Sequence, residues 1–427
     1  MTTKTANIAT PQAAKEKKWL PEYNIWFYAL FGTAVGAGTL FLPVQLGLSG
    51  PLAMLVMLLI ALPFTYYPHL GLARYILSSD SPSPTLLSAT QQYYGTTVAR
   101  IVNALYTLTF LLIIFVYAIS ITNSADSVLR QFWQIQLPRP LLAVLVVSAL
   151  HALFLFGKQV TLKIMGMLVI PLIIYLTALA LTLISHWDTQ NILRMANDIR
   201  LDAPSLEALW LLLPVMVFSF SHTPIISTFA NHCKHTYGDG AENHIRRIMK
   251  PSYLMICVTI LFFVFSCVFT LSPAEIAATK AQNLTILTAI AQKSALFWIA
   301  LTATPVAIIA MAKSFLGTYF GVLEGVRGLV GSVEHDVLHQ KTNQKRDKLI
   351  SMGLIFILTL LMTLWNPNTL NVIAGISGPM IALILFILPS LSFWLVKPLR
   401  PYRSLTSLMV LLTGVASFGI AVFNLLH

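Results

Sequence analysis

The sequence predicts an all-α integral membrane protein, and three observations lead to this fold class. Of the 427 residues, 57% are hydrophobic and 10% are charged, and the mean hydropathy is +0.77. A soluble domain carries roughly 25% charged residues, so most of this chain does not face water. The apolar residues also form long unbroken runs, whereas membrane strands alternate over about ten residues.

A helix needs about 20 mostly apolar residues to cross the hydrocarbon core of a bilayer. Such runs occur eleven times, at approximately residues 25–46, 50–73, 101–125, 140–157, 160–185, 207–231, 251–271, 295–323, 349–365, 371–396 and 404–426. The longest connections, 186–206, 232–250 and 324–348, are polar and too short for a globular domain. The first run exceeds a signal-peptide core and has no small-residue cleavage site, so we expect no removable signal.

The basic residues indicate the orientation of the chain. The formal charge of +12 suggests nucleic acid only if the charges form one patch, and here they lie between the apolar runs. With a cytoplasmic N-terminus, Lys313 lies inside a span, and the outer segments hold six of the 27 lysines and arginines: Arg130, Arg139, Arg194, Arg200, Lys280 and Lys293. The other twenty are internal, as the positive-inside rule requires. The odd number of spans then puts the C-terminus outside.

Two of the predicted spans carry helix-breaking residues in their middles. The first has Gly32, Gly36 and Gly38 within seven residues, and glycine adopts non-helical dihedrals at low steric cost. The sixth reads FSFSHTP over residues 218–224, where Pro224 has no N–H for a helical bond and disfavours helical geometry before it. Each break alone is equally consistent with helix packing.

The pairing of the breaks favours a transporter. The two spans occupy corresponding positions in two five-helix halves, residues 25–185 and 207–396, as in inverted-repeat transporters. Residues 1–24 are then a cytoplasmic tail, 186–206 an external connection and 397–427 an eleventh helix with the C-terminus. A half-helix N-terminus offers N–H groups to a carboxylate, and freed carbonyls accept bonds from an ammonium group. Such a pair of ends suits a zwitterion, and we expect substrate contacts from Thr33, Gly36, Gly38, Tyr117, Ser219, Phe220, Ser221, His222 and Thr223.

The same residues resemble the bacterial hydroxy and aromatic amino acid permeases, and most closely their serine and threonine branch. The resemblance rests on GTAVGAGTLFLP (32–43), VMVFSFSHTPIIS (215–227), ISITN (119–123), FSCVFTLSP (265–273) and AKSFLG (312–317), and it extends from about residue 26 to the end. It implies an eleven-helix bundle with a five-plus-five inverted repeat, in the amino acid–polyamine–organocation superfamily. It also implies proton-coupled uptake at the inner membrane. The sequence departs from that branch at Ser221 and Thr223, where asparagine and serine are usual.

Two lysines are candidates for proton coupling. Lys313 stands alone in the eighth span, and a charge at that depth costs at least about 2.5–3.5 kcal/mol. It either extends to the membrane surface or serves as an ammonium in place of a coupling cation. Lys163 is the rival, because related permeases of the superfamily place a lysine in the fifth helix. Its other interpretation is an anchor at the inner leaflet.

Other functions have weaker support. Apart from Glu207 at the edge of the sixth run, the predicted spans contain no carboxylate, which argues against an enzyme, and two breaks within one bundle argue against a channel. No ATP-binding glycine-rich loop is present, so we expect an ion gradient as the driving force, no cofactor and a monomer. Importers of another neutral or aromatic amino acid, and a channel-like pore, remain the alternatives. His232, Cys233, His235 and His244 do not have the spacing of a closed zinc site.

Overall fold

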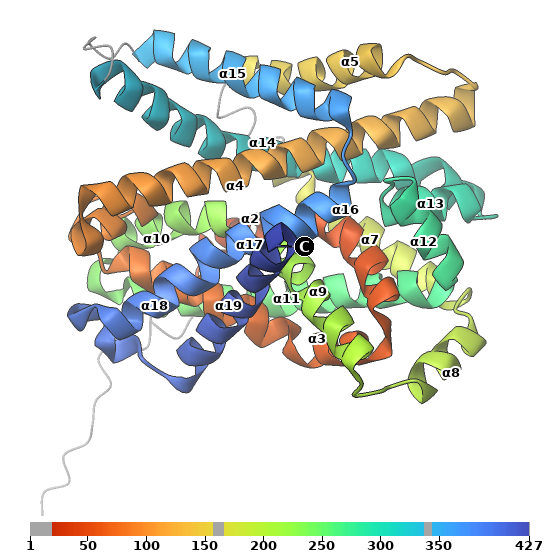
Figure 1. Cartoon of the computed structure of the whole chain (residues 1–427), viewed down its shortest axis with the longest axis horizontal. Helices are drawn as coiled ribbons and strands as arrows, with labels where there is room; N and C mark the ends of the chain where they lie inside the picture. Colours follow the sequence, from red (N-terminus) through yellow and green to blue (C-terminus); the bar gives the residue numbers. More distant parts are fainter. Residues whose placement is uncertain (1–18, 157–165, 337–343, 427) are drawn as a thin grey trace, which may run out of the picture.

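The computed structural model describes residues 19–156, 166–336 and 344–426, and the described residues form helices and contain no strand (Figure 1). The α-helices of the first half are α2 (Tyr23–Ala34), α3 (Ala37–Leu77), α4 (Leu86–Trp133), α5 (Arg139–Ala152) and α7 (Val169–Ile184). Those that follow are α8 (Thr189–Asn197), α9 (Ala203–Phe220), α10 (Thr223–Tyr237), α11 (Ala241–Thr270), α12 (Pro273–Ala281), α13 (Ile286–Lys293), α14 (Phe297–Asp336), α15 (Gln344–Trp365), α16 (Thr369–Val372), α17 (Gly378–Ala382), α18 (Leu388–Leu395) and α19 (Leu405–Leu426). Short 3₁₀ turns occur at η1 (Leu153–Phe156), η2 (Gly238–Gly240) and η5 (Lys397–Tyr402), and π-helical turns at η3 (Ile373–Ser377) and η4 (Leu383–Ile387).

Eight helical segments of the described residues are long and apolar enough to cross a membrane, and α5 and α7 are shorter apolar helices. This number differs from the eleven predicted runs because neighbouring runs share a helix and because breaks shorten others. The first and second runs both reach into α3, which bends at Gly50, where φ is 81°. The segment Thr223–Thr270 likewise holds the end of the sixth run and the whole of the seventh.

The polar connections are more helical than their composition suggests. Segment 232–250 is almost entirely helical, because α10 runs to Tyr237 and α11 begins at Ala241. In the same way α14 continues to Asp336, beyond the predicted span. Polar residues end an apolar run without ending a helix, so these helices extend past the hydrocarbon region.

The helices pack in a consistent order around the middle of the protein. The long helices α4 and α14 lie side by side, with α5 and α15 together on their outer side (Figure 1). On the other side α3 packs against α9 and α11, and α19 covers α9 and α17. The largest fully buried side chains come from α2, α3, α9, α11 and α14, among others. They include Phe31, Phe41, Phe220, Phe263 and Phe315.

The helical chain is interrupted at both places where the sequence carries breakers. Between α2 and α3, Val35 is extended (φ −87°, ψ 101°) and Gly36 is nearly fully extended (φ −153°, ψ −149°). Between α9 and α10, Ser221 is extended (φ −81°, ψ 131°) and His222 has φ −133° and ψ 36°. Since α3 packs against both α9 and α10, the two interruptions belong to one region of the bundle.

Candidate functional site

Neighbouring helices hold the break between α2 and α3 through side-chain hydroxyls. Ser314 of α14 donates from Oγ to the carbonyl of Val35 over 3.1 Å. Ser219 of α9 donates from Oγ to the carbonyl of Gly38 over 2.9 Å. A helix end buried without partners costs several kcal/mol per group in hydrocarbon, and these two bonds satisfy carbonyls on either side of the break.

The glycines at this break are required by close packing. A Cβ at Gly36 would lie 2.6 Å from Oγ of Ser314 and 3.1 Å from the Tyr117 hydroxyl. A Cβ at Gly38 would lie 2.5 Å from Cα of Ser219. The backbone at the break is therefore in direct contact with α4, α9 and α14.

The break between α9 and α10 is organised by its own polar residues. The hydroxyls of Ser221 and Thr223 are 2.8 Å apart, and the amide of Thr223 donates to Oγ of Ser221 over 3.4 Å. Pro224 occupies the first turn of α10, where its missing N–H removes one unpaired donor. The Ser221 hydroxyl thus lies at the start of a half-helix.

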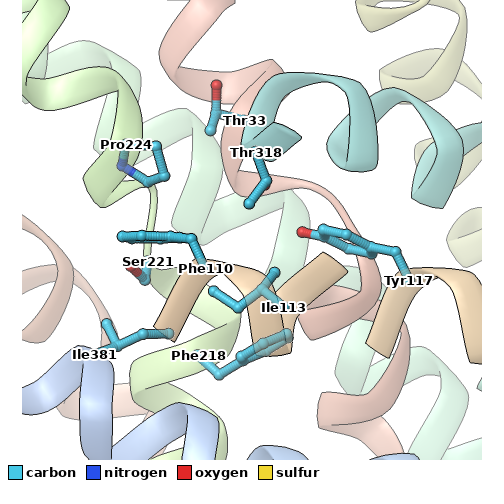
Figure 2. A pocket seen from close by; sticks show the side chains of 9 residues that line it. All are labelled: Thr33, Phe110, Ile113, Tyr117, Phe218, Ser221, Pro224, Thr318 and Ile381. Atoms are coloured by element: carbon cyan, nitrogen blue, oxygen red, sulfur yellow. The ribbon is translucent and has the colours of Figure 1, made fainter. Parts of the chain in front are cut away.

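A pocket lies between the two breaks (Figure 2). Its polar groups are four hydroxyls, which belong to Thr33 on α2, Tyr117 on α4, Thr318 on α14, and Ser221 between α9 and α10. The remaining lining residues are Phe110, Ile113, Phe218, Pro224 and Ile381. The cavity itself is small, about 20 Å³. None of the nine lining residues carries a full charge, so the walls suit a net-neutral molecule.

The structure brings together some of the expected residues and not others. Thr33, Tyr117 and Ser221 line the pocket, and Gly36 lies against Tyr117 at its edge. Gly38 and Ser219 contact each other instead, and neither they nor the buried Phe220, His222 and Thr223 are lining residues. Sequence reasoning missed the other six lining residues: Phe110, Ile113, Phe218, Pro224, Thr318 and Ile381. A signal was available, because Phe110, Ile113 and Tyr117 follow helical spacing on one face.

Comparison with known proteins decides the family. The model of the tryptophan/tyrosine permease family matches residues 27–422. The chain belongs to the tryptophan/tyrosine permease family. This confirms the resemblance that the sequence motifs indicated, and it makes the protein an amino acid transporter and not an enzyme.

Curated relatives and one solved structure agree with this assignment. The chain is 40% identical to the inner membrane transport protein YqeG of Escherichia coli K12, with 95% of this chain and 99% of the relative covered. It is 34% identical to the serine transporter SdaC of the same strain, covering 99% of each. The crystal structure of MhsT in complex with L-phenylalanine has 15% sequence identity and a TM-score of 0.56, covering 96% of this chain and 99% of MhsT. The permease therefore shares the fold of MhsT.

Lys313 of the permease lies at the first break. Its side chain is 1% exposed, and Nζ has no hydrogen-bond partner in the part of the chain that the structure describes. A Cβ built on Gly32 of α2 would be 3.8 Å from this Nζ and 2.6 Å from Val169 of α7. The ammonium thus lies between α14 and the last turn of α2, beside Ser314. Lys163 falls outside the described residues.

The histidines and the cysteine of segment 232–250 serve contacts within the permease. His244 is 2.5 Å from the Tyr23 hydroxyl through Nδ1, and its ring stacks on Tyr237. Trp26 packs against His232, and Cys233 is buried. The described residues contain no group of three or more histidine, cysteine or acidic side chains that could hold a metal ion.

Proposed function

We propose that this permease is a proton-coupled symporter that imports a small hydroxylated amino acid, with serine as the first candidate, by alternating access. The observation that carries the proposal is the pair of helix breaks on one uncharged pocket. Secondary transporters build substrate sites from such broken helices. The name of SdaC supports serine, and the name of YqeG supports the bacterial inner membrane.

The two ends of a zwitterion have distinct partners in this proposal. The carboxylate binds the free amides at the N-terminus of α3, whose helix dipole favours an anion. The Tyr117 hydroxyl adds a donor from α4, since it faces the hydroxyls of Ser314 and Thr318 beside Gly36. The ammonium binds carbonyls at the C-terminal ends of α2 and α9. Ser221 and Thr318 then offer hydrogen bonds to a substrate hydroxyl.

The architecture in the proposal is the five-plus-five repeat with eleven spans. Residues 25–185 and 207–396 form the halves, each beginning with a broken helix. The segment 186–206, which includes α8, is external, and the last span is α19 in residues 397–427. The excess of basic residues in alternate connections supports a cytoplasmic N-terminus and an external C-terminus. A monomer suffices, because both breaks lie in one chain.

Lys313 is the coupling residue in this proposal, and its place beside Gly32 supports the role. The protonated ammonium supplies the positive charge that holds α14 against α2 with the pocket open outward. Loss of the proton removes this charge and frees the inner half of α2 to move. Lys163 is the alternative if Lys313 has no effect on coupling.

A second candidate substrate is a larger neutral or aromatic amino acid. Phe110, Phe218 and Ile381 give the pocket aromatic and aliphatic walls, which favour an apolar side chain. MhsT, which shares the fold, was solved with L-phenylalanine. The two candidates differ in their hydrogen bonds to Ser221 and Thr318. A hydroxylated substrate side chain can bond to these two hydroxyls, whereas an aromatic side chain such as that of phenylalanine cannot.

Uptake into proteoliposomes tests the proposal. Purified permease is reconstituted, and labelled L-serine is supplied with and without an inward proton gradient, with each unlabelled amino acid as competitor. We expect saturable uptake, exchange with internal serine, and accumulation only with the gradient. Strong competition by phenylalanine and weak competition by threonine would select the second candidate. Flux that is unsaturable and without exchange would instead indicate a channel.

A further inference from the structure

A second buried polar cluster lies at the break between α9 and α10, apart from the pocket lining. The rings of His69 on α3 and His222 stack with centroids 3.8 Å apart and 4° between their planes. Tyr253 of α11 packs against both rings, at 5.6 Å from His69 and 4.8 Å from His222. All three side chains are at most 1% exposed, so the cluster is closed to water.

Hydrogen bonds fix where the protons lie on His69. Its Nδ1 is 2.7 Å from the carbonyl oxygen of Thr65, and since a carbonyl only accepts, Nδ1 carries a hydrogen. Its Nε2 is 3.1 Å from the backbone amide nitrogen of His222, and since that amide only donates, Nε2 carries none. His69 is therefore a neutral imidazole that caps an amide at the helix break.

An added proton would leave the cluster either with a buried unpaired charge or without one of its hydrogen bonds. His222 donates from Nδ1 to the carbonyl of Phe220 over 3.1 Å, and its Nε2 has no partner among the described residues. A proton on that Nε2 would be a buried charge without an acceptor. A proton on Nε2 of His69 would instead face the His222 amide donor and displace it. The intact break thus requires a neutral pair.

The other titratable groups around the pair are weak acids rather than carboxylates. Tyr66 of α3 packs on Tyr253 with ring centroids 6.0 Å apart. Cys257 of α11 lies with Sγ 3.7 Å from Oγ1 of Thr65, the residue whose carbonyl binds His69. These groups offer no negative charge near neutral pH and so do not compensate an imidazolium.

We propose that His69 is a positioning residue of the transport site: its neutral Nε2 holds the His222 amide and so fixes the break beside Ser221, and protonation of the histidine pair releases it. The inference rests on the proposed function and deepens it. It adds to Lys313 a second proton-responsive group with the opposite effect, because a proton on Lys313 holds the site and a proton on the histidine pair loosens it. Transport should therefore fail on the acid side of its pH optimum.

Amide hydrogen exchange of the whole chain tests the contact without any substrate. Mass spectrometry follows the peptide that contains His222 in His69→Leu, in His69→Gln and in the control His151→Leu. His151 is also a buried histidine that binds the carbonyl four residues earlier, over 2.8 Å, but it lies on α5. We expect exchange about tenfold faster in His69→Leu, because an unpaired buried amide is costly. His69→Gln keeps an acceptor oxygen and should retain protection, as should His151→Leu.

The pH dependence separates positioning from simple packing. Corrected for intrinsic exchange rates, protection in the wild type should persist near neutral pH and fall only below about pH 5, because burial without an acidic partner opposes protonation of the pair. Protection in His69→Gln should stay constant, and this variant serves even if His69→Leu does not fold. Equal protection in all three proteins, or the same pH dependence in His69→Gln, would overturn the inference.

Binding of labelled L-serine then links the contact to function. His69→Leu should bind about tenfold more weakly than wild type, whereas His69→Gln should bind normally and keep its affinity at acid pH. A wild type that binds no serine but shows the exchange pattern would contradict the proposed substrate and leave the positioning role standing. Wild-type serine affinity in His69→Leu would contradict the positioning role.

Discussion

Gly36 and Gly38 lie where the broken helix touches α14 and α9. A side chain added at either position would clash with a different neighbour. The atom nearest a Cβ at Gly36 is the hydroxyl of Ser314, and the atom nearest one at Gly38 is the backbone Cα of Ser219. Rotation of the Ser314 hydroxyl would break its bond to Val35 and would leave Cβ of Ser314 at 2.9 Å from the added Cβ, and the backbone at Ser219 cannot move without displacing α9. Gly36 therefore borders the pocket through Tyr117, whereas Gly38 packs against α9.

Alanine substitution should show this difference. Gly38→Ala should destabilise the permease by about 1–3 kcal/mol, as overpacking does, and lower its melting temperature. Gly36→Ala should also be destabilised, and unlike Gly38→Ala it should lose serine binding, because the Cβ would push Ser314 and Tyr117 from the pocket edge. Gly353→Ala on α15 is the control, since nothing lies within 4 Å of its Cβ. Normal serine affinity in Gly36→Ala would count against the site.

Lys313 gives the second prediction at this scale. Lys313→Ala should still bind serine, since Lys313 is not among the residues that line the pocket, but it should no longer accumulate serine in response to a pH gradient. Lys313→Arg should stop turnover, because a guanidinium stays charged. The measurement is serine accumulation in proteoliposomes at fixed external pH. Accumulation by Lys313→Ala at the wild-type level would remove Lys313 from the coupling mechanism.

Sequence reasoning located part of the site, for a physical reason. Thr33, Tyr117 and Ser221 are polar residues in apolar spans, which marks them without a structure. Phe110 and Phe218 are apolar residues among many, and only the rotation of α4 and α9 assigns them to the pocket. His222 was expected at the substrate, but its ring stacks on His69, and a contact between distant spans is not visible in one sequence.

At the scale of elements, asparagines join the helices at one end of the bundle. Asn283, between α12 and α13, donates to the carbonyl of Pro367 over 2.9 Å and accepts the amide of Thr369 over 2.7 Å. Asn123 of α4 donates to the carbonyl of Asn283 over 3.1 Å, and Arg139 of α5 donates to Asn123. This network ties α12 and α13 to α4, α5 and α16.

Asn283 should contribute to stability in two separable ways. Its φ is 55°, a conformation that glycine adopts freely and alanine does not. Asn283→Gly should lose the side-chain bonds alone, at about 1–3 kcal/mol, and Asn283→Ala should lose about 1 kcal/mol more. Thermal unfolding in detergent measures both. Equal melting temperatures for wild type and Asn283→Gly would show that the asparagine network does not stabilise this end of the bundle.

The elements themselves were predictable where composition changes sharply. The breaks followed from glycines and a proline, and the described part of each apolar run is largely helical. The pair α12 and α13 was not expected, although Ser272 and Glu275 form a capping box there, a signal that precedes many helices. Apolar runs indicate helices long enough to cross a membrane, and they do not indicate the shorter helices between them.

At the scale of the whole molecule, two broken helices and the Lys313 side chain share one small region of the bundle. The breaks between α2 and α3 and between α9 and α10 meet at the pocket, and Lys313 lies beside the last turn of α2. Helix ends leave amides and carbonyls outside the helical hydrogen-bond pattern, and the two breaks place such ends beside one pocket. The proposed zwitterionic substrate would use both kinds of group at once.

Competition for labelled serine by its two blocked forms tests this claim most directly. Serine methyl ester lacks the carboxylate, and N-acetylserine lacks the ammonium. Each should bind at least about tenfold more weakly than serine, because hydrogen bonds to charged groups contribute about 1.5–3 kcal/mol. If either blocked form competes as well as serine itself, the two helix breaks do not hold the two ends of the substrate.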